Sequence, residues 1–281
     1  MTANDNSDQE GLWKANTFLE ELPDDIRPFR DLLETYSKIP PDEVDNHLYK
    51  IRDKAWDIAH YPCIGRWSFT NLKLLQGPTF QAVIARLKAP DSQDALLDVA
   101  CCVGQVSRKL AADGVDPARL YSTDLVPAFI DIGFELFRDR DRFPPGAFVA
   151  ADLLKPDDAG AAALDGKVTL VHASNFFHLF PWEQQVQAAV RMVRFLKAGT
   201  TDAAIFGAQI GCPQPGEIKA LMGAGTRFAH DPESLQKMWD EVGERTGTKW
   251  RVEAGWVGEL PFQIPGFPEE IRYLKFAVYQ A

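Results

Sequence analysis

Apolar and polar positions along the middle of the chain follow two patterns. Strands are predicted at 95–100, 119–123, 147–151, 167–173 and 202–209. The runs at 95–100 and 202–209 are mostly apolar, which is typical of strands covered on both faces of a sheet. Between them, apolar residues recur every three or four positions, which predicts helices. These helices are expected at 106–112, 127–138 and 181–197. The alternation predicts an α/β fold, a doubly wound and mostly parallel sheet with helices on both faces.

A different pattern precedes the sheet. Residues 1–10 are polar and acidic, so we expect them to be disordered. Apolar residues at helical spacing predict helices at 42–59 and 72–87. The segment 61–67 between them combines proline, glycine and aromatic residues, and we expect either a packed plug or a lid over a site. Residues 1–89 are therefore predicted to form a helical N-terminal cap.

The α/β core is expected to span residues 90–281 and to carry an insertion. Residues 212–230 are rich in glycine and proline and are expected to form an inserted loop. A helix is predicted to start at Asp231-Pro232. Two apolar stretches follow at 249–260 and 271–279, and no helical pattern separates them. They are therefore predicted to be antiparallel neighbours.

Composition narrows the class of partner. The chain has 281 residues, of which 46% are hydrophobic, which is ample for a large core. The formal net charge of −10 disfavours a nucleic-acid partner, because phosphate binding needs a basic surface. We find no long apolar run and no secretory leader, so no membrane span is expected and a cytoplasmic location is predicted. A small-molecule substrate is expected, and the sequence does not decide between a monomer and a homodimer.

The four cysteines are Cys63, Cys101, Cys102 and Cys212. Their spacing matches neither a disulfide framework nor a zinc site, so a reducing setting and no metal are expected. Cys101 and Cys102 are interpreted as small packing residues rather than nucleophiles.

The segment from Asp98 to Gln105 follows the first strand and opens a helix. Such a turn presents free backbone N–H groups and the positive end of the helix. Dinucleotide sites carry three glycines in this turn so that a pyrophosphate can approach. Here Ala100 and Cys102 stand at the first glycine positions and only Gly104 remains. The sequence therefore argues against a dinucleotide and favours a nucleoside with a smaller, zwitterionic tail.

Acidic residues stand at the ends of the next two predicted strands. Asp124 can accept hydrogen bonds from both hydroxyls of a ribose, although it can also cap the following helix. Asp152 can bind an adenine amino group while Leu153 packs on the ring. The alternative for Asp152 is a solvated strand end.

With these residues in place, the chain resembles the class I S-adenosylmethionine (SAM) methyltransferases from about residue 90 onward. It more closely resembles the fungal methyltransferases of meroterpenoid and polyketide pathways. That closer resemblance is carried by three segments, YPCIGRW at 61–67, LDVACCVGQ at 97–105 and HDPESL at 230–235. It implies a Rossmann-like fold of seven strands, the last of them antiparallel, and SAM as cofactor. Several members of this group methylate a carboxyl group of a farnesylated aromatic polyketide.

The resemblance and the chemistry together give a set of candidate site residues. The candidates for cofactor binding are Tyr61, Asp98, Ala100, Cys101, Gly104, Gln105, Asp124, Leu125, Asp152, Leu153 and Ser174. The candidates for the acceptor pocket are Trp67, Phe69, Phe177 and Gln209. The candidates for a catalytic or anion-binding role are His178, His172 and Arg66. The alternatives are a core aromatic for each ring, a structural histidine for each imidazole, and a surface ion pair for Arg66.

We therefore expect a SAM-dependent O-methyltransferase that esterifies a carboxylate of an apolar meroterpenoid intermediate. A carboxylate is ionised at neutral pH and needs no base. The first alternative is a phenol or alcohol O-methyltransferase, which would use His178 or His172 as general base. The second is a SAM-binding partner protein without catalytic activity. A dinucleotide-dependent oxidoreductase comes last, because the diphosphate-binding glycines are missing.

Overall fold

The computed structural model describes residues 11, 13–219, 225–259 and 267–281. The expectation of disorder at 1–10 lies outside them. The chain divides into two compact units, which we describe one at a time. Unit 1 comprises Met1–Ser92, Cys101–Leu120 and Val126–Phe148, and unit 2 comprises Gln93–Ala100, Tyr121–Leu125 and Val149–Ala281.

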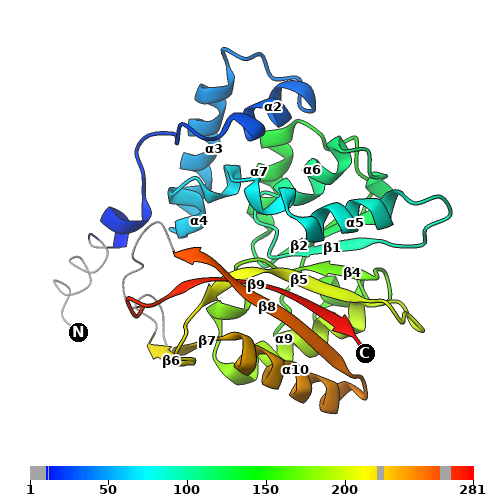
Figure 1. Cartoon of the computed structure of the whole chain (residues 1–281). Helices are drawn as coiled ribbons and strands as arrows, with labels where there is room; N and C mark the ends of the chain where they lie inside the picture. The colour runs from blue at the N-terminus through cyan, green and yellow to red at the C-terminus, as the bar shows by residue number, and fades with distance from the viewer. Residues whose placement is uncertain (1–10, 12, 220–224, 260–266) are drawn as a thin grey trace. The chain divides into compact units, whose positions relative to one another are not determined.

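Most of a seven-stranded sheet belongs to unit 2 (Figure 1). Its strands are β1 (Leu96–Val99), β2 (Leu120–Asp124), β3 (Phe148–Ala150), β4 (Leu170–His172), β5 (Ala204–Gly211), β8 (Trp250–Glu259) and β9 (Arg272–Gln280). They lie in the order β3-β2-β1-β4-β5-β9-β8. Strands β1, β4 and β5 pair in parallel, whereas β9 pairs antiparallel with both β5 and β8. The predicted fold class and the antiparallel final pair are therefore confirmed.

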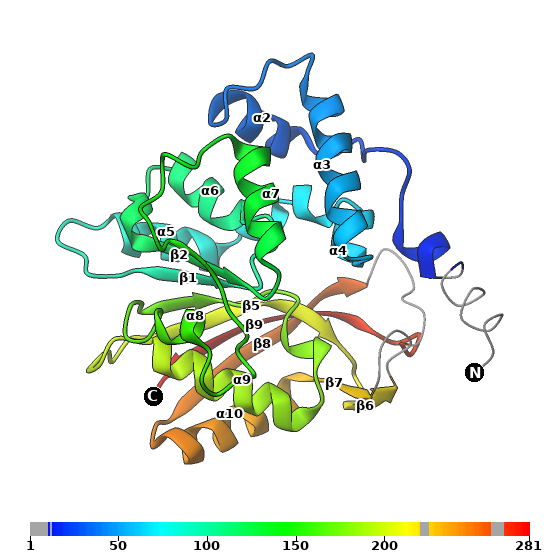
Figure 2. The same cartoon turned by 180° about the vertical axis from the view of Figure 1, so that it is seen from behind.

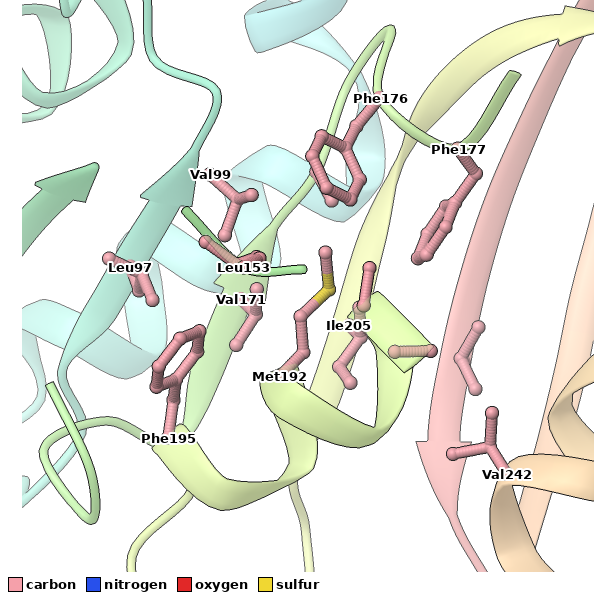
Figure 3. Packing of buried hydrophobic residues seen from close by; sticks show 14 of the residues in the cluster. Leu97, Val99, Leu153, Val171, Phe176, Phe177, Met192, Phe195, Ile205 and Val242 are labelled. Carbon is pink, nitrogen blue, oxygen red and sulfur yellow. The ribbon is translucent and has the colours of Figure 1, made fainter. Parts of the chain in front are cut away.

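Three helices of unit 2 lie along one face of this sheet (Figure 2). They are α8 (Ala159–Ala162), α9 (Trp182–Phe195) and α10 (Pro232–Thr246). Helix α10 begins at a capping box, in which the Asp231 side chain accepts from the Ser234 N–H. Figure 3 shows how Met192 and Phe195 of α9 gather with Val171 of β4 and Ile205 of β5. These side chains are buried, and burying each contributes about 1.5–3 kcal/mol to stability.

Unit 1 is built mainly from helices. They are α2 (Arg27–Thr35), α3 (Val44–Ile58), α4 (Pro62–Gly65), α5 (Pro78–Lys88), α6 (Gln105–Ala112) and α7 (Pro127–Phe137), with the 3-10 helices η1 (Ser68–Thr70), η2 (Lys73–Gln76) and η3 (Pro117–Arg119). The predicted helix at 42–59 is α3, whose buried face carries Val44, Leu48, Ile51 and Ala55. No helix in the described parts of the chain is long and apolar enough to cross a membrane.

Two expectations about local structure were wrong. The helix expected at 72–87 is split, because Gly77-Pro78 ends η2 and starts α5. The loop expected at 212–230 contains a separate two-stranded sheet, β6 (Gly216–Lys219) and β7 (Thr226–Ala229). These strands pair antiparallel, with Ile218 opposite Arg227. Glycine and proline favour loops locally, and here the pairing of the two short segments overrides that preference.

Candidate active site

The turn between β1 and α6 has the backbone shape of a glycine-rich loop, although it contains a single glycine, Gly104. Its alternate residues have positive φ, 54° at Ala100, 51° at Cys102 and 67° at Gly104. An L-residue costs about 1–2 kcal/mol in this left-handed region. Such cost is commonly retained where a backbone must meet a ligand. The first N–H groups of α6, which begins at Gln105, lack intrahelical partners and can bind one.

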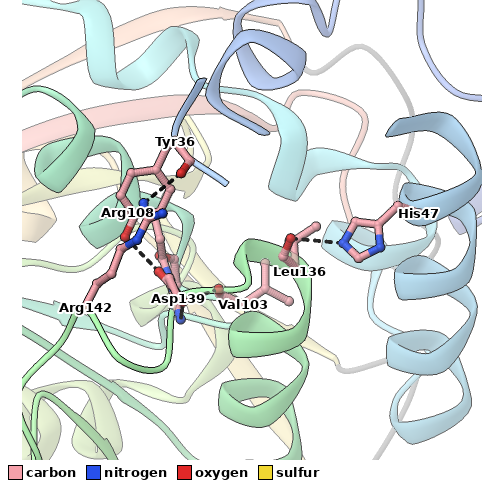
Figure 4. Close-up of polar contacts among 8 residues, drawn as sticks. Tyr36, His47, Val103, Arg108, Leu136, Asp139 and Arg142 are labelled. Carbon is pink, nitrogen blue, oxygen red and sulfur yellow. Dashed lines mark hydrogen bonds and ion pairs between the residues drawn. The ribbon is translucent and has the colours of Figure 1, made fainter. Parts of the chain in front are cut away.

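Arg108 of α6 supports the second half of this turn within unit 1 (Figure 4). Its Nη1 donates to the Val103 and Gly104 carbonyl oxygens, at 3.1 and 3.4 Å. A Cβ at Gly104 would lie 2.2 Å from that nitrogen. Gly104 is thus required both by its φ and by the space that Arg108 takes.

A buried carboxylate balances the charge of Arg108. The Nε and Nη2 atoms of Arg108 donate to Asp139, at 3.0 and 3.2 Å, and both side chains are fully buried. Tyr36 donates to the same carboxylate at 2.8 Å, and burial is the main reason that the pKa of Tyr36 is raised. The rings of Phe134, Phe137, Phe143 and Phe148 stand around the guanidinium at 4.1–5.5 Å. Sequence reasoning missed this group, because nothing local pairs Arg108 with a residue 31 positions later.

Asp98, at the end of β1, belongs to a buried polar chain in unit 2. One carboxylate oxygen lies 2.6 Å from His172 Nδ1, and His172 Nε2 lies 2.8 Å from Ser174 Oγ. Ser174 Oγ in turn accepts from the Ala208 N–H at 3.2 Å. We assign the His172 hydrogen to Nδ1, since Ser174 can then donate to Nε2. The other oxygen of Asp98 is buried and has no hydrogen-bond partner in the described part of the chain.

The two other acidic strand ends also lie in unit 2. Asp124 ends β2 and is 9% exposed, and its carbonyl accepts from the Ala151 N–H. Leu125 beside it is exposed. Asp152 accepts from the Leu154 N–H at 2.9 Å, which fixes a turn after β3. Leu153 is buried in the core near Val171 (Figure 3).

His178 and Gln209 are buried polar residues of unit 2. Both polar atoms of the Gln209 side chain and the Nδ1 atom of His178 find no hydrogen-bond partner among the described residues. Burial, with a smaller effect from the Arg227 charge, lowers the pKa of His178 to about 3. The imidazole is therefore neutral at physiological pH. Phe177 is buried beside Phe276, with ring centroids 6.0 Å apart.

The remaining candidates lie in unit 1. Tyr61 precedes α4 and is 46% exposed, with its ring 6.0 Å from that of Phe129. Arg66 donates to the Asn16 carbonyl at 2.9 Å, and burial lowers its pKa. Trp67 and Phe69 are buried, and Trp67 Nε1 donates to the Leu19 carbonyl. Their proposed roles toward cofactor and acceptor stay predictions.

The described part of the chain contains no cluster of three or more His, Cys, Asp or Glu side chains that could hold a metal ion. None of the four cysteines, all of which the structure describes, forms a disulfide, and Cys101 and Cys212 are buried.

Two family models match the chain. Residues 16–70 match the meroterpenoid methyltransferase N-terminal domain, and residues 96–199 match a methyltransferase domain. The second match begins at β1 and covers the turn, the acidic strand ends and the histidines described above.

Curated relatives extend over most of the chain. The O-methyltransferase atr3 of Stereocaulon alpinum is 40% identical over 261 residues, which cover 92% of this chain and 74% of that protein. The O-methyltransferase phiE of a fungal species is 39% identical, covering 85% of this chain and 78% of that protein. The asnovolin E/chermesin D methyltransferase nvfJ of Aspergillus novofumigatus is 34% identical, with 80% of each chain covered.

Solved structures show the same fold at low sequence identity. A Burkholderia thailandensis 1,6-didemethyltoxoflavin-N1-methyltransferase has a TM-score of 0.52 at 15% identity, covering 84% of this chain and 90% of that one. The [4+2]-cyclase SpnF has a TM-score of 0.50 at 14% identity, covering 72% and 80%. A cyclase among these neighbours shows that the fold alone does not define a reaction.

The fold and the methyltransferase domain define the chain as a SAM-dependent methyltransferase. It belongs to the family of fungal methyltransferases that includes the O-methyltransferases atr3 and phiE, and its residues 16–70 match the meroterpenoid methyltransferase N-terminal domain. Its cofactor is SAM.

Proposed function

We propose that the enzyme forms a methyl ester on a carboxylate of an apolar meroterpenoid intermediate. The observation that supports this proposal most directly is the surroundings of two histidines, His178 and His172, which make both of them poor candidates for a general base. Burial lowers the pKa of His178 to about 3, which makes its imidazole a poor general base. His172 has hydrogen-bond partners at both ring nitrogens, Asp98 and Ser174. A phenol or alcohol would need a base, whereas a carboxylate is already ionised.

The residues at the strand ends fit a nucleoside with a zwitterionic tail. The unpartnered oxygen of Asp98 can accept a hydrogen bond from an ammonium group, and Asp124 can accept from ribose hydroxyls. The left-handed turn brings backbone N–H groups to a ligand without a bulky side chain in the way. Asp152 and Leu153 are proposed for the adenine. SAM supplies an electrophilic methyl group on a sulfonium, and the protein aligns the acceptor oxygen and excludes water.

The first experiment is calorimetry with S-adenosylhomocysteine (SAH) on the wild type and two variants. Asp124→Asn keeps the shape of the side chain and removes the charge that accepts both ribose hydroxyls, so we expect SAH affinity to fall at least about tenfold. Asp157→Asn is the control, because Asp157 is exposed after β3 and should leave the affinity unchanged. Unchanged affinity in Asp124→Asn would remove Asp124 from the ribose site, and no binding to the wild type would reject the proposed cofactor site.

A further inference from the structure

Gln209 occupies an unusual place on β5. Side chains alternate along a strand, so Gln209 shares a face with Ile205 and with the position of Gly207. That face packs against α9 and α10, and the β9 residue opposite Gln209 is the buried Leu274. An unpaired buried amide costs about 1–3 kcal/mol. Gln209 has two unpaired polar atoms and no exposed surface, so a partner from outside the chain would recover that cost.

His178 lies on a short segment that crosses from β5 to β7. At one end the Asn175 N–H donates to the Ala208 carbonyl, the neighbour of Gln209 in β5. At the other end the Phe228 N–H, in β7, donates to the Phe180 carbonyl. Between these bonds lies η4 (Phe177–Leu179), with Phe177 packed on Phe276 opposite Gly207. His178, whose Nδ1 atom is unpartnered, therefore belongs to a segment that contacts both the strand that carries Gln209 and the strand β7.

Arg227 supplies a positive charge at the second of these strands. It precedes Phe228 in β7 and is partly buried, and burial lowers its pKa. A guanidinium nevertheless stays protonated in proteins. Its charge is one of the two causes that lower the pKa of His178, which places the two groups within electrostatic reach. The site thus combines one cation with neutral donors and acceptors.

We propose that Arg227, with the unpartnered polar atoms of Gln209 and His178, binds the carboxylate of the acceptor. Arginine pairs with carboxylates through two parallel N–H bonds, which fixes the plane of the acid and hence the direction of the attacking oxygen. The amide of Gln209 and the ring nitrogen of His178 can each bond one carboxyl oxygen. This inference rests on the proposed esterification and adds to it the residues that select an acid over an ester or phenol.

The test measures binding of three probes to the SAH complex by calorimetry. The probes are a farnesylated 2,4-dihydroxybenzoic acid, its methyl ester, and the phenol that lacks the carboxyl group. We expect the wild type to bind the acid at least about tenfold more tightly than the ester, the worth of one charged hydrogen bond. Arg227→Gln should remove that preference and leave the SAH affinity unchanged. Lys219→Gln, an exposed cation on β6, is the matched control and should keep the preference.

Gln209→Leu separates binding from packing. Removing two unpaired buried polar atoms should raise the melting temperature, while the affinity for the acid falls. If Arg227→Gln fails to fold, Arg227→Lys makes the same comparison, with an intermediate loss expected because lysine cannot bind in the bidentate way.

The results distinguish the two proposals. Equal binding of acid and ester by the wild type, or an acid preference that survives in Arg227→Gln, overturns the inference. Failure of the acid to bind while SAH binds also overturns it. Failure of SAH to bind rejects the proposed cofactor site instead.

Discussion

Ala100 and Cys102 hold a left-handed backbone that glycine adopts without strain. The methyl and thiol groups of these residues are small, so the strain lies in the backbone rather than in side-chain clashes. We expect Ala100→Gly and Cys102→Gly each to raise the free energy of unfolding, by up to about 1 kcal/mol after the entropy cost of glycine. Urea unfolding measures this change.

Val99→Gly is the control for that prediction, since Val99 is buried in β1 and has ordinary strand geometry. It should destabilise the protein, because it removes a packed side chain and adds chain entropy. A loss of stability in Ala100→Gly and Cys102→Gly equal to that of Val99→Gly would show that the turn is not strained.

His178 makes the stability depend on pH. The folded pKa of about 3 lies below the usual value of about 6.5, so the unfolded chain binds more protons between these pH values. The contribution of His178 to the free energy of unfolding is therefore fully present above pH 6.5 and is lost as the pH is lowered toward 3. At pH 4.5 the loss from this residue alone is about 3 kcal/mol. His230, with a pKa lowered by burial to about 4, acts in the same direction.

His178→Asn should remove the His178 part of this acid sensitivity, whatever its effect at neutral pH. The measurement is urea unfolding of wild type and variant from pH 7 to pH 4.5. His60→Asn, at an exposed position after α3, should leave the slope unchanged. A variant slope equal to that of the wild type would contradict the assignment of a buried, neutral His178.

For single residues, the sequence predicted their positions along the strands better than their hydrogen-bond partners. Asp98 is the residue before the last of β1, Asp124 is the last residue of β2, and Asp152 follows β3 by two residues. The sequence did not predict that Asp98 bonds His172, because that bond depends on the pairing of β1 with β4. Nor did it single out Arg227, which gains its significance only from the way the segment 175–180 connects β5 to β7.

At the scale of elements, the Arg108–Asp139 pair ties α6 to the chain that follows α7. Removing one partner of a buried ion pair leaves an unpaired charge and costs about 3–5 kcal/mol. We expect Asp139→Ala to lose that much in urea unfolding. Asp131→Ala, which breaks the exposed pair with Arg140, should lose less than about 1 kcal/mol.

The double variant Arg108→Met/Asp139→Leu tests the cause of the loss. It removes both charges, so it should recover much of the stability that Asp139→Ala loses. Because Arg108 also holds the Val103 and Gly104 carbonyls, SAH affinity should stay reduced in the double variant. Full recovery of SAH affinity would show that Arg108 does not position the turn.

The periodic elements of the fold could be predicted from sequence, and the pairings that depend on distant segments could not. The strands β1, β2, β4 and β5 could be predicted to within a few residues, and for β1 and β5 the signal is a mostly apolar run, as expected for strands buried on both faces. The β6–β7 pair was missed, since its four-residue strands carry partly exposed side chains and little apolar signal. The sequence placed Gln209 at the end of its strand, whereas β5 continues to Gly211, and its complete burial depends on residues distant in sequence such as Leu274 of β9.

At the scale of the whole molecule, family membership and site chemistry answer different questions. The relatives and the methyltransferase domain establish SAM-dependent O-methylation. They do not identify the acceptor oxygen, whose selection we propose for Arg227, Gln209 and His178. The cap expected over residues 1–89 also stays a prediction, although residues 16–70 match a defined N-terminal domain.

The most direct test of the central claim is to find the atom that receives the methyl group. The enzyme is incubated with SAM carrying a deuterated methyl group and an apolar extract of fungal culture, and the labelled products are identified by mass spectrometry. Mild alkali is then applied, since it cleaves a methyl ester and leaves a methyl ether intact. If the enzyme esterifies a carboxylate, alkali should remove the label and regenerate a free acid; a label that survives alkali would show that the acceptor is not a carboxylate.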